Sequence, residues 1–172
     1  MRIGLLSDTH GFLLPPLLDF LSGCDELWHA GDIGNLETLQ TLRAFKPLRA
    51  VCGNIDGRDI RLECPEELIF TVEGLKVCMI HIGGYPDRYS PRGRQLIQTH
   101  RPGLFVSGHS HILKAMPDRK YNLLHLNPGA AGFYGWHRFT TAMRFEISNG
   151  VPSDLEIYQI GRDEAARFRP AP

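Results

Sequence analysis

Polar side chains that can bind metal ions recur at seven positions, each shortly after an apolar run that predicts a strand. The set contains two carboxylates, one amide and four imidazoles: Asp8, His10, Asp32, Asn54, His81, His109 and His111. The carboxyl ends of parallel strands meet at one edge of an open α/β sheet, and that edge is where ligands bind. The order of these residues therefore predicts that they gather at a single edge.

Two of these signals are pairs separated by one residue, Asp8-Thr9-His10 and His109-Ser110-His111. In an extended segment, residues i and i+2 point to the same side, so each pair can aim both side chains at one point. A glycine directly precedes three of the candidate ligands, Asp32, Asn54 and His109, as expected where the chain turns tightly next to a site. These glycines are Gly31, Gly53 and Gly108.

Seven oxygen and nitrogen ligands exceed the needs of one transition metal and suit two ions that share a carboxylate. Four histidines disfavour Mg²⁺ or Ca²⁺ and suit Mn²⁺, Fe²⁺, Zn²⁺, Ni²⁺ or Co²⁺, of which we expect Mn²⁺. Two divalent ions, two aspartates and a bridging hydroxide sum to a charge of about +1, which attracts an anion such as phosphate. Two metals roughly 3.5–4 Å apart can activate that hydroxide for in-line attack and clamp phosphoryl oxygens.

The elements that must position these residues alternate in type along the first half of the chain. Strands are predicted at 2–6, 26–30, 48–52 and 104–107. Helices are predicted at 15–21, at 36–45 after an Asn35 cap, and between Ser90-Pro91 and Pro102. This β-α-β order predicts parallel strands joined by right-handed crossovers.

The second half of the chain indicates antiparallel pairing. Glu73-Gly74 and Asn149-Gly150 are hairpin signals between apolar runs at 68–72 and 75–82 and at 141–147 and 155–160. Weaker strands are predicted at 114–116 and 123–126, and the polar segment 161–172 is expected to be a loose tail. The fold class is therefore α/β, with a parallel half and a more antiparallel half.

Length and composition narrow the class of protein. A chain of 172 residues fits one domain, 1–172, and is too short for a TIM barrel, which needs about 250 residues. It carries 19 basic and 19 acidic residues, so its net charge is zero and gives no signal for binding nucleic acid or membranes. The first apolar run is too short for a signal-peptide core, and the four cysteines lack CxxC spacing. We therefore expect free thiols and a cytoplasmic protein.

Taken together, the seven residues and their neighbouring glycines resemble the signature of the calcineurin-like metallophosphoesterases. The segments Gly53-Asn54-Ile55-Asp56-Gly57 and Asn127-Pro128-Gly129 are similar to the compact bacterial and archaeal phosphodiesterase branch, which also includes Vps29. The resemblance covers residues 1 to about 132. It implies a four-layer αββα sandwich of the metallo-dependent phosphatase type, with two mixed β-sheets flanked by helices.

The resemblance also implies a role for each ligand. Asp8, His10, Asp32 and His111 would hold one metal ion, while Asp32, Asn54, His81 and His109 would hold the other, with Asp32 bridging. Asp32, Asn54 and His109 would act in catalysis. The implied activity is hydrolysis of a small phosphoester, and we expect a phosphodiesterase with a nucleotide-like substrate.

Two positions depart from the family pattern. Ile55 stands where many members carry a histidine that contacts phosphate or protonates the leaving group. This difference favours substrates with good leaving groups, or protonation of the leaving group by water or by another residue. Ile82 replaces the glycine of a common His-Gly-His segment. Asn54, Arg58 and Tyr85 are candidate substrate contacts, with Arg58 expected on a loop after the Asn54 segment. A surface role is an alternative for Arg58 and for Tyr85.

The competing hypothesis is a catalytically weak or inactive, Vps29-like interaction scaffold. It would bind metal without turnover and expose a sizeable apolar patch away from the metal edge. Self-association into a homo-oligomer is an open expectation for either function. The other histidines, including His137, have no motif partner and are expected to be ordinary.

Overall fold

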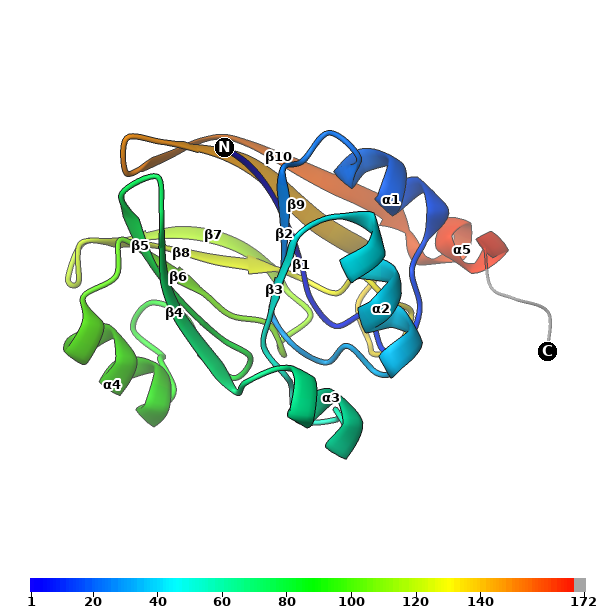
Figure 1. The fold of residues 1–172 in the computed structure, drawn as a ribbon, viewed down its shortest axis with the longest axis horizontal. Helices are drawn as coiled ribbons and strands as arrows, with labels where there is room; N and C mark the ends of the chain where they lie inside the picture. Colours follow the sequence, from blue (N-terminus) through cyan, green and yellow to red (C-terminus); the bar gives the residue numbers. More distant parts are fainter. Residues whose placement is uncertain (169–172) are drawn as a thin grey trace.

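The computed structural model describes residues 1–168, which form ten strands in two five-stranded sheets (Figure 1). The first sheet has the order β10-β9-β1-β2-β3, from β1 (Arg2–Leu6), β2 (Glu26–His29), β3 (Leu48–Ala50), β9 (Phe139–Ser148) and β10 (Val151–Gly161). The second has the order β4-β5-β6-β8-β7, from β4 (Glu67–Val72), β5 (Leu75–Ile80), β6 (Leu104–Val106), β7 (Leu113–Asp118) and β8 (Leu123–Pro128).

Both sheets are mixed, as predicted. In the first sheet β1, β2 and β3 run parallel, whereas β9 pairs antiparallel with both β1 and β10. In the second sheet β5, β6 and β8 run parallel, and antiparallel β4 and β7 form the edges. The parallel strands of each sheet therefore end together and supply the edge at which the predicted ligands follow.

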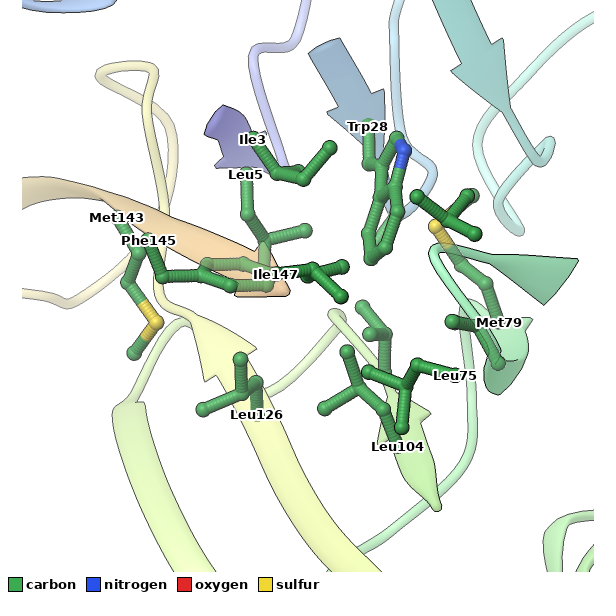
Figure 2. Close-up of a cluster of buried hydrophobic side chains, with 14 of the residues drawn as sticks. Ile3, Leu5, Trp28, Leu75, Met79, Leu104, Leu126, Met143, Phe145 and Ile147 are labelled. Atoms are coloured by element: carbon green, nitrogen blue, oxygen red, sulfur yellow. The ribbon is translucent and has the colours of Figure 1, made fainter. Parts of the chain in front are cut away.

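The main core lies between the two sheets and follows from the alternation of side chains along each strand (Figure 2). Ile3 and Leu5 of β1 point into this core, whereas Leu6 packs on the opposite side beneath helices. Trp28 of β2 meets Phe145 of β9 edge to face, with ring centroids 5.8 Å apart. Burying one such side chain fully is worth about 1.5–3 kcal/mol.

Helices cover the outer face of each sheet and complete the predicted four-layer sandwich (Figure 1). The helices α1 (Pro15–Leu21), α2 (Leu36–Phe45) and α5 (Arg162–Ala165) pack on the first sheet, and α4 (Pro91–His100) packs on the second. The predicted caps are present: Asn35 accepts the Thr38 N–H, and Ser90 accepts the Gly93 N–H.

The hairpin and cysteine predictions are confirmed. Glu73 and Gly74 both have positive φ, 47° and 82°, which is the backbone of a two-residue I′ hairpin turn. All four cysteines are free and buried, and burial raises the pKa of Cys64 and of Cys78 to about 11. No helix within residues 1–168 is both long enough and apolar enough to cross a membrane.

Two local expectations were wrong. The loop expected around Arg58 is the short helix α3 (Arg58–Glu63), which forms because Ile60 packs against Leu39 and Cys52. The segment expected to be a loose tail from residue 161 continues as α5 and a 3₁₀ turn to Phe168, with Ala165 fully buried under the first sheet. Residues 169–172 of that expectation lie outside the described part of the chain.

One buried histidine makes the stability of this fold depend on pH. His125 of β8 lies beneath α4, 3.0 Å from the Ser107 hydroxyl, and burial lowers its pKa to about 4. In the unfolded chain a histidine has a pKa of about 6.5. Between these values only the unfolded chain takes up the proton, so acid shifts the equilibrium toward unfolding.

We therefore predict that the contribution of His125 to the free energy of unfolding of the metal-free protein is level above pH 6.5 and falls as pH drops toward 4. His125→Gln, which keeps a donor for Ser107 but cannot titrate, should reduce the loss between pH 7 and 4.5 by about 2–3 kcal/mol. Urea unfolding at the two pH values measures it. An unchanged pH dependence in the variant would contradict the prediction.

Candidate metal centre

All seven predicted ligands lie beyond the carboxyl ends of parallel strands. Both sheets contribute, so the site forms where the C-terminal edges of the two sheets meet rather than at the edge of one sheet. The ligands follow their strands in this order: Asp8 and His10 after β1, Asp32 after β2, Asn54 after β3, His81 after β5, and His109 and His111 after β6.

The first group of side chains is Asp8, His10 and His111, whose ligand atoms all lie within 4.8 Å of one another. The His111 Nε2 is 3.2 Å from Asp8 Oδ1 and 3.4 Å from His10 Nε2. Asp8 Oδ2 accepts the backbone N–H of His109 at 3.2 Å, but Oδ1 is buried and has no hydrogen-bond donor within residues 1–168. A buried carboxylate oxygen without a donor is costly, and a cation held here removes that cost.

The second group is Asp32, His81 and His109, whose ligand atoms also lie within 4.8 Å of one another. His81 Nδ1 lies 2.8 Å from the Ala30 carbonyl, to which it donates. Its Nε2 therefore faces the site, 3.2 Å from Asp32 Oδ1 and 3.2 Å from Asn54 Oδ1. Metal-binding histidines in proteins are oriented in this way, with the second ring nitrogen bonded to a carbonyl or carboxylate.

Electrostatics keep the Asp32 carboxylate charged. Burial alone would raise its pKa, but the hydrogen bond and charge of His81, together with the Ile55 N–H, bring the pKa below its ordinary value. Burial likewise acts to lower the pKa of His81, and this effect is outweighed by Asp32 and Asp8, which raise it. An ionised carboxylate at this point favours a cation beside it.

The backbone around the ligands is unusual. Five of the seven have positive φ, between 49° and 65°: Asp8, His10, Asp32, His109 and His111. Aspartate and histidine tolerate this region better than most residues, and such conformations cluster at functional sites. The inference that i and i+2 pairs aim at one point therefore fails for His109 and His111, which belong to different groups, whereas Asp8 and His10 do meet in one group.

Close backbone approach depends on Gly53. A Cβ placed there would lie 2.0 Å from Asp32 Oδ1, so no larger residue fits between the loops after β2 and β3. Asp56 binds these same loops together, because its carboxylate accepts the N–H groups of Ile33, Gly34 and Gly53.

A cavity adjoins each group. One of about 530 Å³ is lined by Asn54 and His81, and its other walls include Ile82 and Pro91. A second, of about 400 Å³, is lined by His109 and His111 together with Trp136. A small molecule could therefore reach each of the two groups of ligands through the cavity beside it.

Some sequence predictions fall outside these cavities. Arg58 is exposed at the first residue of α3, and Tyr85 is half-buried with the Lys114 ammonium 4.5 Å from its ring centroid. Neither lines either cavity. The Ile55 side chain is 48% exposed and carries no ionisable group, so it supplies no proton.

Other residues near the site were not anticipated. His137 Nδ1 lies 3.2 Å from His111 Nδ1, and the Tyr134 ring centroid is 5.8 Å from that of His10. The only local signal was the density of glycines and aromatic residues that follows Asn127-Pro128-Gly129.

Comparison with known proteins agrees with this arrangement. Residues 1–150 match the calcineurin-like phosphoesterase superfamily domain. The chain is 33% identical over 140 residues to a probable metallophosphoesterase of Methanocaldococcus jannaschii, across 76% of this chain and 68% of that protein.

Two solved structures share the fold. Vps29 of Entamoeba histolytica, complexed with zinc, aligns with a TM-score of 0.73 at 17% identity, across 94% of this chain and 99% of that one. An archaeal phosphodiesterase aligns with a TM-score of 0.71 at 18% identity, again across 94% and 99%. From the match over most of its length, the chain belongs to the calcineurin-like phosphoesterase superfamily.

Proposed function

We propose that this protein is a phosphodiesterase that uses two divalent metal ions. The observation that carries the proposal is the pair of adjacent groups, each with a buried carboxylate and two imidazoles. In the first group Asp8 Oδ1, His10 Nε2 and His111 Nε2 all face one point, and Oδ1 has no donor within the described residues. A donor set of oxygens and imidazole nitrogens suits Mn²⁺, Fe²⁺, Zn²⁺, Ni²⁺ or Co²⁺.

The proposed assignment places one ion with Asp8, His10 and His111 and the other with His81, His109 and Asn54, with Asp32 shared between them. Asn54 joins the second ion because its Oδ1 lies 3.2 Å from His81 Nε2. The Vps29 structure complexed with zinc shows that a protein of this fold accepts a divalent ion. We take Mn²⁺ as the first ion to test.

When bound, two such ions activate water as a nucleophile and offset the charge of the phosphoryl oxygens. Side chains of the protein would bind the substrate and hold the ions. Asn54 and His109 are exposed and would face the phosphoryl group, whereas the buried Asp32 carboxylate would be shared by the two ions. Because position 55 is isoleucine, no acid stands there for the leaving group, and substrates with stable leaving groups are favoured.

The two cavities support a diester rather than a monoester. A diester carries two organic groups, and one cavity adjoins each metal group. In the larger cavity Arg92 pairs with Glu67, and Arg61 pairs with Glu66 at 3.1 Å. These charges cancel, so the cavity favours an uncharged organic group over a second phosphate.

The smaller cavity favours a flat aromatic group, as in a nucleotide-like substrate. Trp136 is fully exposed at its wall, and Tyr134 of the same loop is 64% exposed beside His10. Stacking of a base on an aromatic side chain is worth about 1–3 kcal/mol. We therefore propose an aryl or nucleoside diester.

A scaffold like Vps29 is the second candidate. The observation that favours it is the isoleucine at position 55, which leaves the site without an acid there. The likeness to Vps29 itself concerns the fold alone. The complete set of ligands favours the enzyme, and turnover separates the two functions.

We predict that the Mn²⁺-loaded protein hydrolyses bis-p-nitrophenyl phosphate and that the chelated protein does not. Its kcat/KM should exceed that for p-nitrophenyl phosphate by about tenfold or more, because burying a second aryl group is worth at least about 1.4 kcal/mol. Release of p-nitrophenol is the measurement. Metal binding with no turnover in Mn²⁺, Ni²⁺, Co²⁺ or Zn²⁺ would support the scaffold instead.

Loss of the shared carboxylate should affect both ions. We predict that Asp32→Asn lowers the affinity for two equivalents of Mn²⁺, whereas His10→Ala lowers it for one. Equilibrium dialysis followed by metal analysis gives both stoichiometries, and His100→Ala on α4 is a control outside both groups. The same pattern of loss in the two variants would refute the sharing by Asp32.

Trp136 should act on substrate binding without altering the metals. We predict that Trp136→Ala raises KM for bis-p-nitrophenyl phosphate by about tenfold, as expected from the loss of one stacking contact, with kcat and metal content unchanged. Trp136→Phe should keep a KM close to that of the parent protein. Equal KM values for the alanine variant and the parent would show that the substrate does not contact this side chain.

A further inference from the structure

His111 has a second histidine on the side of its ring away from the first metal group. Its Nε2 faces Asp8 and His10, while its Nδ1 lies 3.2 Å from His137 Nδ1. On the far side of His137, Nε2 lies 3.0 Å from the Gly132 carbonyl oxygen. The four nitrogens thus form a continuous path from a backbone carbonyl to the metal group.

The chemistry of the carbonyl sets the direction of every hydrogen bond on this path. A carbonyl oxygen only accepts, so His137 donates to Gly132 through Nε2–H. A neutral imidazole has one N–H, so His137 Nδ1 must accept, and the only hydrogen available to it is on His111 Nδ1. His111 Nε2 then carries no proton and presents a lone pair toward Asp8 Oδ1 and His10 Nε2.

The contact between the two rings depends on Gly135. This residue has a φ of +122°, and a Cβ there would lie 2.3 Å from His111 Nδ1 and 3.1 Å from His137 Nδ1. Its carbonyl accepts a hydrogen bond from Arg162 Nη1 at 2.7 Å, which fixes the loop from the side of α5. The loop is therefore built to let the two imidazoles meet.

We propose that His137 is a positioning residue that holds His111 in the Nδ1–H tautomer and so presents it as a ligand to the metal ion held by Asp8 and His10. The inference rests on the proposed two-metal function. In the second group a backbone carbonyl, that of Ala30, performs the same task for His81. Among residues 1–168, a side chain is seen in this role in the first group alone, which makes the two groups separable by substitution.

The tautomers can be read without any metal. In the metal-free protein, ¹⁵N NMR of the histidine rings should show the hydrogen on Nδ1 of His111 and on Nε2 of His137. Hydrogen on Nε2 of His111, or on Nδ1 of His137, would overturn the proposal. Because the parent protein is measured, this test stands even where a variant fails to fold.

Metal affinity gives the second readout. His137→Leu keeps a side chain of similar size but removes the hydrogen-bond acceptor for His111. It should lower the affinity for one of two Mn²⁺ equivalents by about 10–100-fold, which is the typical loss when the hydrogen-bond partner of a metal-binding histidine is removed. His137→Asn offers Oδ1 to His111 and should restore most of that affinity, and His100→Leu should change neither equivalent. Calorimetric titration measures all three.

The outcomes separate this inference from the proposed function. Equal weakening by leucine and asparagine, no weakening by leucine, or equal weakening of both equivalents would overturn the role of His137. The expected tautomers and affinities in a protein that hydrolyses no phosphoester would support the role of His137 and refute only the proposed activity.

Discussion

The loop after β1 is tied to three other loops at the metal edge through one buried residue, Asp8. Its backbone N–H donates to the Gly31 carbonyl at 2.9 Å, and its carbonyl accepts the Gly132 N–H at 3.0 Å. Its carboxylate accepts the His109 N–H, so loops from both sheets meet on this residue. One carboxylate oxygen of Asp8 has no hydrogen-bond donor in the described structure. A cation held between this oxygen and the neighbouring imidazoles would offset the cost of burying it.

The general fold and the ligand edge could be predicted from sequence because their signals are local. Each apolar run ends at a polar residue, Asn35 caps its helix, and the Glu73-Gly74 dipeptide encodes its own turn. The support around the ligands could not be predicted in this way. His137 lies 26 positions from His111, and only the three-dimensional path of the loop brings their rings together.

Two errors have a common physical origin. The pairing of His109 with His111 assumed an extended backbone, whereas both residues adopt positive φ and diverge to different groups. The segment after β10 was judged by its polarity, yet one small residue, Ala165, is buried and holds α5 against the first sheet. Tertiary contacts decided both cases, and no local periodicity carries that information.

The fold alone does not determine the activity, since closely similar backbones belong to Vps29 and to an archaeal phosphodiesterase. For the present chain, the two buried carboxylates and four imidazoles at one edge support the proposed enzyme, and turnover is what separates it from a metal-binding scaffold. Under the proposed function, Ile55 would limit which leaving groups the site can serve. Family membership thus identifies the fold, whereas the side-chain geometry indicates which chemistry the site supports.

The position of β1 in its sheet has a consequence for synthesis of the chain. β1 lies between β2 and β9 in the sheet, and its partner Phe145 comes more than a hundred residues after Ile3. Pairings of such long sequence separation form late in folding. During translation β1 therefore keeps one edge unpaired until β9 has been made, and the sheet that carries Asp8 and Asp32 gains its β1–β9 pairing only after strands β2 to β8 have been synthesised.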